Sequence, residues 1–135
     1  MAMNATILGN AMASAAGIVD APGIAACQSI AAALIAAHKR GVTVRLVLDS
    51  EGKGNKYSQG DECAAAGIDV AWDAKHLIMH SKVMVVDAQV VVTGSFNFTA
   101  SAETGNAENL LVINDPKVAA AYAANWDLHR GHSAP

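Results

Sequence analysis

The chain has 135 residues, which suits one domain with a single modest core and gives no reason to divide it. Although 53% of the residues are hydrophobic, only 4% are aromatic, so the core must be built from Ala, Val, Ile and Leu in thin layers. The formal net charge of −3 argues against a protein that coats nucleic acid through bulk positive charge, and leaves room for a small site that takes one phosphate.

The N-terminal segment, residues 1–21, shows no clear pattern of its own. Residues 5–19 are apolar and small and contain Ala-Met-Ala and Ala-Ser-Ala triplets like those at export cleavage sites, but no Lys or Arg precedes them. The pattern therefore does not amount to a complete signal peptide. It is too short and too rich in Gly, Asn and Ser for a membrane span, and we expect no stable membrane insertion.

Helical and strand patterns alternate through the middle of the chain, which indicates α/β layers with at least some parallel pairing. Apolar positions recur at helical spacing up to a basic last turn and a glycine, and β-branched runs follow. The expected elements are a helix over 22–40, a strand over 42–48, a glycine-containing loop over 50–60, a short helix over 61–66 capped by Asp61, and a strand over 68–72.

The second half predicts a hairpin, a further strand and a long final helix. Residues 79–87 and 90–93 read as two strands joined by Ala88-Gln89, and residues 108–113 as another strand. Asp115-Pro116 supplies a cap and a first-turn proline for a helix to about Leu128, after which the chain is expected to fray. The domain is placed at residues 22–130, with 131–135 as a tail.

Two basic residues stand close together in the first strand of this hairpin. His80 and Lys82 are two apart, so on a strand both side chains leave the same face and share one pocket. Asp87 lies at odd spacing from both, so a structural or turn-stabilising role suits it better than direct catalysis.

Polar residues beyond the hairpin repeat this geometry. Ser95 and Asn97 are also two apart, and Gly94 before them allows a close approach of backbones. A hydroxyl and an amide beside the Lys82 ammonium are the donors that the non-bridging oxygens of a phosphodiester need. Glu108 opens the next strand, where its carboxylate could accept a hydrogen bond from an imidazole and fix the tautomer.

These residues resemble the motifs of the phospholipase D superfamily. The resemblance rests on the H-x-K-x-x-x-x-D run of His80, Lys82 and Asp87, on residues 94–97 (Gly-Ser-Phe-Asn), and on residues 106–111 (Asn-Ala-Glu-Asn-Leu-Leu). It extends from about Ile24 to Trp126, and the chain is most similar to small bacterial endonuclease-like members that carry a single motif.

The resemblance implies a three-layer α/β/α sandwich around a mixed sheet and a homodimer whose two motifs complete one active site. One His80 would attack phosphorus and form a phosphohistidine, while His80 of the partner subunit would protonate the leaving oxygen and later activate water. Lys82, Ser95 and Asn97 would hold the phosphate, Glu108 would orient a histidine, and Asp87 would complete the motif. No metal or other cofactor would be required.

The resemblance leaves the substrate and the start of the chain open. Residues 1–21 do not resemble the strand, helix and strand with which such members usually begin, so this segment is interpreted as divergent or truncated. The leading function is metal-independent phosphodiester hydrolysis on nucleic acid. The alternatives are cleavage of phospholipid head groups and an inactive, dimerising remnant. Related small members are often exported, which suggests a periplasmic or secreted bacterial protein.

The other histidines and the cysteines receive ordinary interpretations. His76 and His80 are four apart, but the sequence lacks the Glu of H-E-x-x-H and continues as a β-branched run, so a helical zinc pair is not favoured. His38, His129 and His132 are assigned to solvated helix ends or the tail. Cys27 and Cys63 are expected to be small buried residues, and Trp72 and Trp126 core anchors.

Overall fold

The computed structural model describes residues 17–20, 28–55, 58–98, 102 and 105–135. Its centre is a six-stranded sheet in the order β3-β2-β1-β4-β5-β6. The strands are β1 Gly17–Asp20, β2 Val44–Asp49, β3 Asp69–Asp73, β4 Val83–Val86, β5 Val90–Gly94 and β6 Leu110–Asn114. Around them lie α2 Gln28–Lys39, the 3-10 turn η2 Ser50–Gly52, α3 Gly60–Ala65 and α5 Pro116–His132.

The sheet is mixed, and its parallel and antiparallel halves meet at β1. Strand β1 pairs in parallel with β2, which pairs in parallel with β3. On its other side β1 pairs antiparallel with β4, and the hairpin and β6 continue the antiparallel half. The sheet therefore begins before the boundary predicted at residue 22, and its central strand comes from the segment interpreted as divergent.

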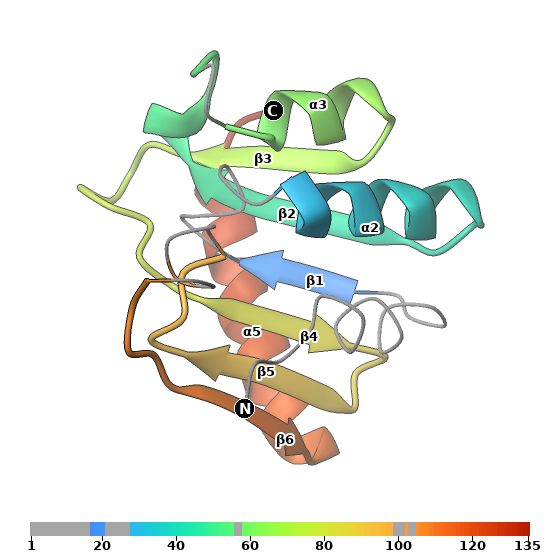
Figure 1. Ribbon diagram of the computed structural model, residues 1–135, viewed down its shortest axis with the longest axis vertical. Coiled ribbons are helices and arrows are strands. Elements are labelled where there is room, and N and C mark those ends of the chain that lie inside the picture. Colours follow the sequence, from blue (N-terminus) through green and yellow to red (C-terminus); the bar gives the residue numbers. More distant parts are fainter. Residues whose placement is uncertain (1–16, 21–27, 56–57, 99–101, 103–104) are drawn as a thin grey trace.

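Helices cover both faces of the sheet, which confirms the expected three-layer sandwich. Figure 1 shows α2 and α3 in front of the sheet and α5 crossing behind it. Helix α2 contributes Ile30 and Leu34 to the main core, where they meet Leu46 of β2 and Phe98. Behind the sheet, Trp126 packs with buried residues of β2 and β3, as its assignment to the core predicted.

Two helix ends are where the sequence placed them. The helix predicted over 22–40 is seen as α2, and its first predicted residues, 22–27, lie outside the described residues. It stops before Gly41, whose φ of +94° belongs to the left-handed region that favours glycine. At the start of α5 the Asp115 carboxylate accepts the backbone N–H groups of Lys117 at 2.7 Å and Val118 at 3.3 Å, which confirms the cap.

Three local predictions were wrong. The strand predicted over 79–87 is shorter, Val83–Val86, and residues 79–82 lie outside its described ladders with β1 and β5. Asp61 does not cap α3: Gln59 precedes the helix, and the Asp61 carboxylate accepts the Gly54 N–H at 2.7 Å. The C-terminal residues do not fray, because α5 continues to His132 and Ala134 pairs with the backbone of Trp72.

The remaining expectations concern a thiol and the membrane. Cys63 is fully buried, as predicted, and burial, followed by repulsion from Glu62, raises the pKa of its thiol to about 11. Cys27 lies outside the described residues. Among the described helices, none is long and apolar enough to cross a membrane.

Candidate active site

The segment between β3 and β4, residues 74–82, carries His80 and Lys82. It is held at its middle by the Asp49 carboxylate at the end of β2, which accepts the backbone N–H of Met79 at 2.7 Å. The other oxygen of Asp49 accepts the Glu51 N–H at 2.9 Å and caps the 3-10 turn. Because Met79 is also buried, the residue before His80 is fixed by both packing and hydrogen bonding.

His80 and Lys82 meet even though neither lies in a strand. The Lys82 ammonium turns back and donates to the backbone carbonyl of His80 at 2.8 Å, and both residues line a cleft of about 460 Å³. The sequence therefore predicted correctly that His80 and Lys82 are neighbours. The contact is made by the Lys82 ammonium turning back, and not by the alternation of side chains along a strand. The cleft is lined by His80, Ser81, Lys82, Val83, Thr93, Gly94, Ser95, Asn97 and Tyr122.

Lys82 is buried, with 7% of its surface exposed. Burial lowers the pKa of its ammonium, and the negative charge of Glu108 works in the opposite direction. One donor is used by the His80 carbonyl, and an ammonium has three, so two protons can serve an anion in the cleft. A buried cation of this kind favours a ligand that brings negative charge, because the ligand compensates its lost hydration.

Ser95, which lines the cleft, forms a tight pair with Glu108. The Ser95 hydroxyl donates to Glu108 at 2.5 Å and accepts the Asn109 N–H at 3.0 Å, while its backbone N–H donates to the Asn109 carbonyl at 3.0 Å. A second bond from the Asn106 amide reaches Glu108 at 2.9 Å. These two hydrogen bonds lower the pKa of the Glu108 carboxyl, Ser95 contributing most, so Glu108 is held as an anion near Lys82.

The sequence-predicted site residues separate into two groups. His80, Lys82, Ser95 and Asn97 share the cleft. Glu108 bonds to Ser95 and Asn106 rather than to His80, and its role of orienting a histidine stays a prediction. Asp87 lies at the other end of β4, in a turn where Asp87 and Ala88 both have positive φ, 53° and 52°. That position agrees with the turn role preferred for it.

One constellation was missed by the sequence reasoning. Asp73, His76, His129 and His132 gather at the end of β3, although His129 and His132 were assigned to solvated positions. The only available signal was the i, i+3 spacing of His129 and His132, which places two imidazoles on one helix face. This spacing was not recognised as helical, because the helix was predicted to end at about Leu128.

The arrangement in the cleft suits chemistry on a phosphate ester. The cleft brings together an imidazole, a buried ammonium, a hydroxyl and an amide, from His80, Lys82, Ser95 and Asn97. Such donors stabilise negative charge on non-bridging oxygens while an imidazole attacks or transfers a proton.

Comparison with known proteins agrees with this chemistry. A family model described as "Cardiolipin synthase, PLD-like domain" matches residues 13–128. Curated phospholipases D from Rickettsia prowazekii and Rickettsia felis are 47% and 46% identical over 97 residues, 72% of this chain and 47% and 48% of theirs. A mitochondrial cardiolipin hydrolase from Xenopus tropicalis is 38% identical over 101 residues, 75% of this chain and 48% of its own. The chain thus spans about half the length of these relatives.

Two solved structures match over nearly the whole chain. A phospholipase D family member, Nuc, from Salmonella typhimurium is 37% identical with a TM-score of 0.84, covering 95% of this chain and 87% of its own. NucT from Helicobacter pylori has a TM-score of 0.86 at 22% identity, covering 96% of this chain and 88% of its own. At that identity the second match supports the fold alone.

Proposed function

Because this chain belongs to the phospholipase D superfamily, we propose that it is a metal-independent phosphodiesterase with His80 as its nucleophile. The observation that carries the proposal is that His80 and Lys82 line one cleft together with Ser95 and Asn97, which come from a second segment of the chain. If the chain were an inactive remnant, the buried Lys82 ammonium would have no function.

The proposed reaction has two steps. An imidazole nitrogen of His80 forms a bond to phosphorus while the bond from phosphorus to the leaving oxygen breaks, and a second imidazole gives that oxygen its proton. Water then attacks phosphorus, transfers its proton to the second imidazole, and the bond from phosphorus to nitrogen breaks. Lys82 and Asn97 donate to the non-bridging oxygens. Ser95, whose donors are both engaged, would have to turn from Glu108 to reach substrate.

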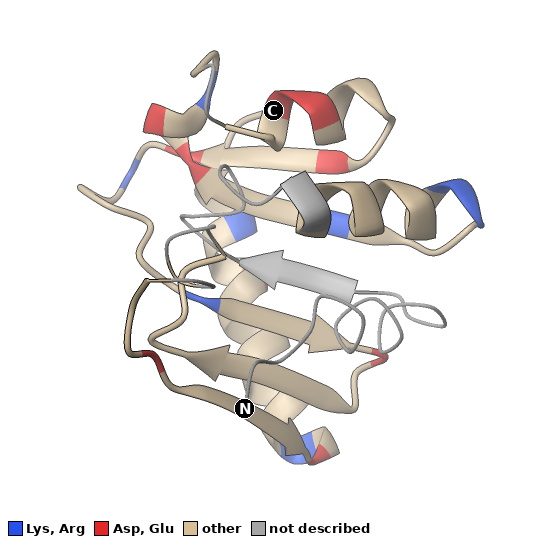
Figure 2. Cartoon of the chain, in the orientation of Figure 1, with Lys and Arg blue, Asp and Glu red and all other residues tan. Residues whose placement is uncertain are grey.

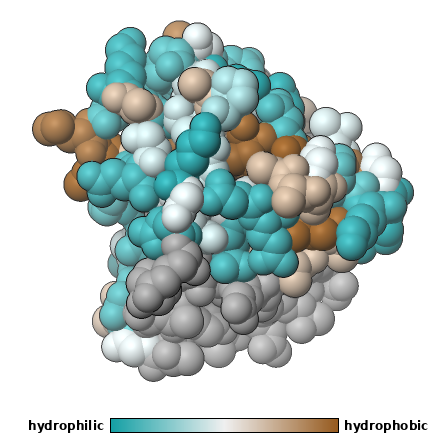
Figure 3. All heavy atoms as spheres, turned by 90° about the horizontal axis from the view of Figure 1, so that it is seen from above, coloured by the Kyte–Doolittle hydropathy of each residue, from teal (hydrophilic) through white to brown (hydrophobic). Residues whose placement is uncertain are grey.

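The second imidazole is proposed to come from a twofold-related copy of this chain. His80 is the one histidine among the residues that line the cleft, whereas the reaction uses two. Apolar side chains near His80 support an interface there, because Leu77 is 98% and Ile78 62% exposed in the single chain. Figure 3 shows apolar side chains that project from one edge of a largely hydrophilic face.

Nucleic acid is the proposed substrate class, on the resemblance of the motifs to the single-motif endonuclease-like branch. Figure 2 shows charged residues scattered over the described part of the chain rather than collected into a broad basic face. We therefore expect binding through the one phosphate at the cleft and weak affinity for intact duplex. Phospholipid is the second candidate, favoured by the names of the curated relatives.

Hydrolysis of bis(p-nitrophenyl) phosphate in excess EDTA tests the proposal. It is run well below the melting temperature of the chelated protein, with wild type, His80→Ala and Lys82→Met in parallel. We expect turnover by wild type and a loss of at least a hundredfold in each variant. Single-stranded DNA, RNA, phosphatidylcholine and cardiolipin vesicles then distinguish the substrate classes. A folded dimer that hydrolyses none of these would establish the remnant reading instead.

A further inference from the structure

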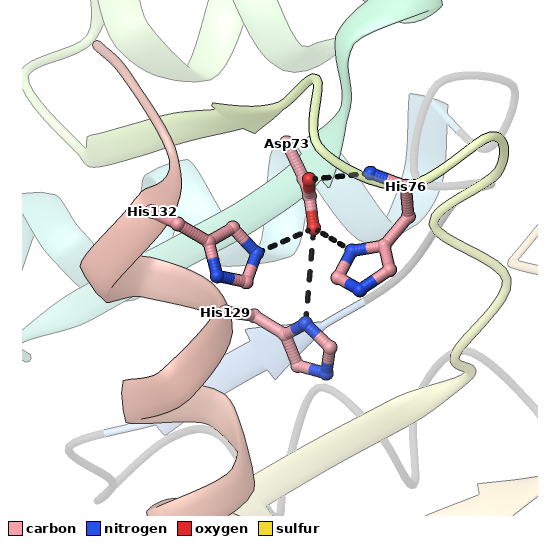
Figure 4. A group of neighbouring side chains, drawn as sticks. All are labelled: Asp73, His76, His129 and His132. Carbon is pink, nitrogen blue, oxygen red and sulfur yellow. Dashed lines mark hydrogen bonds and ion pairs between the residues drawn. The ribbon is translucent and has the colours of Figure 1, made fainter.

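Four side chains that can ligate metals converge at the carboxyl end of β3. Figure 4 shows Asp73, His76, His129 and His132 pointing toward one another, and one potential ligand atom from each lies within 4.8 Å of the others. The Asp73 oxygen Oδ2 lies 2.8 Å from Nδ1 of His76, 3.1 Å from Nε2 of His132 and 3.7 Å from Nδ1 of His129. None of the four lines the cleft at His80.

The fold fixes the elements that bring these residues together. Helix α5 crosses behind the sheet, and its end is tied to β3 by two backbone hydrogen bonds between Trp72 and Ala134, at 2.7 and 3.1 Å. The Arg130 guanidinium also pairs with Asp69 at 3.0 Å. The cluster is therefore preorganised on a strand and a helix rather than on loops alone.

The Asp73 carboxylate is aimed at the cluster by its own backbone contacts. Its Oδ1 accepts the N–H groups of Lys75 at 2.8 Å and His76 at 3.3 Å, which leaves Oδ2 toward the imidazoles. The Asp73 side chain is fully buried, so this oxygen is closed off from solvent.

His129 is not satisfied by this network. Its Nδ1 is buried and has no hydrogen-bond partner among the residues that the structure describes, and 3.7 Å to the Asp73 oxygen is too long for a hydrogen bond. A buried polar atom without a partner ordinarily marks a missing ion or water.

We propose that Asp73, His76, His129 and His132 form a binding site for a divalent transition-metal ion of the zinc class. Three imidazoles and one carboxylate are a ligand set that Zn²⁺ accepts in tetrahedral geometry. Bonds of about 2.0–2.1 Å put tetrahedral ligand atoms roughly 3.4 Å apart, so the separations of up to 4.8 Å need only small side-chain rotations to close.

The site is structural in character and separate from the proposed hydrolysis. Four protein ligands complete a tetrahedral ion and leave no open position for substrate. The metal would join β3, the end of α5 and the segment that leads from His76 to His80, so it would stiffen the support of the cleft without entering the reaction. His76, whose side chain is 44% exposed, provides the route by which the ion and a chelator enter.

The test is zinc binding by the purified chain, stripped with chelator and titrated with ZnCl₂ against a chromophoric competing chelator. We expect one zinc per chain, a higher melting temperature with zinc, and binding at least tenfold weaker in His76→Ala and in His132→Ala. His38→Ala, at a histidine outside the cluster, is the matched control and should bind like wild type. Circular dichroism verifies that each variant is folded.

His76→Ala is the decisive variant because its side chain is half-exposed and its loss removes no core packing. A folded His76→Ala protein that binds zinc as wild type does, or a wild-type chain that takes up no stoichiometric zinc, would overturn the site and leave a hydrogen-bonded cluster around Asp73. His80→Ala should bind zinc normally, so failure of the metal site and failure of the proposed activity are separate results.

Discussion

Replacing Gly94 by Ala should damage both the fold and the cleft. Gly94 has φ +153°, and a Cβ built on it collides with the Asn109 carbonyl oxygen and lies 2.9 Å from the carbonyl carbon. Both contacts are with backbone, so the strands themselves must move. Overpacking costs about 1–3 kcal/mol and the unfavourable φ about 1–3 kcal/mol, so we expect the free energy of unfolding to fall by about 2–6 kcal/mol.

Urea denaturation measures this loss, and Gly41→Ala is its control. Gly41 also has positive φ, +94°, but nothing lies within 4 Å of an added Cβ, so it should suffer only the conformational part. Folded Gly94→Ala should also lose activity, because a shift of β5 from β6 separates Ser95 from the Asn109 backbone. Equal destabilisation in the two variants would contradict the predicted clash with the Asn109 backbone. Full activity in Gly94→Ala would contradict the predicted displacement of Ser95.

Three further substitutions test other parts of the account. Lys82→Met should abolish activity yet keep or raise stability at neutral pH in urea titrations, because a buried charge is removed. Burial lowers the pKa of Lys82 in the folded protein. The free energy of unfolding of wild type should therefore rise as the pH increases from this lowered pKa toward the ordinary value of ~10.4. The stability advantage of Lys82→Met should shrink over the same pH range. Phe98→Ala, at a side chain with 0% exposure, should cost about 3–5 kcal/mol in the same assay. Asp115→Ala should cost about 1 kcal/mol through the lost cap of α5, and a cost near zero would contradict its role.

The fold could be predicted where local chemistry decides the element. The cap at Asp115, the glycine stop at Gly41 and the β-branched runs act within a few residues, and their elements were found near the predicted positions. Strand β1 could not be predicted, because Gly17–Asp20 is four residues long and becomes a strand through its neighbours β2 and β4.

The residues of the cleft could be predicted from the sequence, but the local backbone structure that holds them could not. The motif spacing predicted that His80, Lys82, Ser95 and Asn97 share one site, and all four line one cleft. Residues 79–82 are not part of a strand, and the Asp49 carboxylate holds the backbone of Met79 in place. The bond between Ser95 and Glu108 is a long-range contact that spacing alone does not reveal.

The histidine cluster was out of reach of the sequence for a different reason. Asp73 and His132 are 59 residues apart, and they meet only because α5 crosses the sheet and its end pairs with Trp72. No periodicity within a short window reports such a contact.

The most direct test of the central claim is to trap the covalent intermediate during turnover of bis(p-nitrophenyl) phosphate. The reaction is quenched in alkaline denaturant, which preserves phosphohistidine, and the peptides are analysed by mass spectrometry. The proposed attack of His80 on phosphorus predicts a p-nitrophenyl phosphoryl group on His80 and none in the His80→Ala protein. Turnover by wild type with the adduct on another residue, or unchanged turnover by His80→Ala, would contradict it.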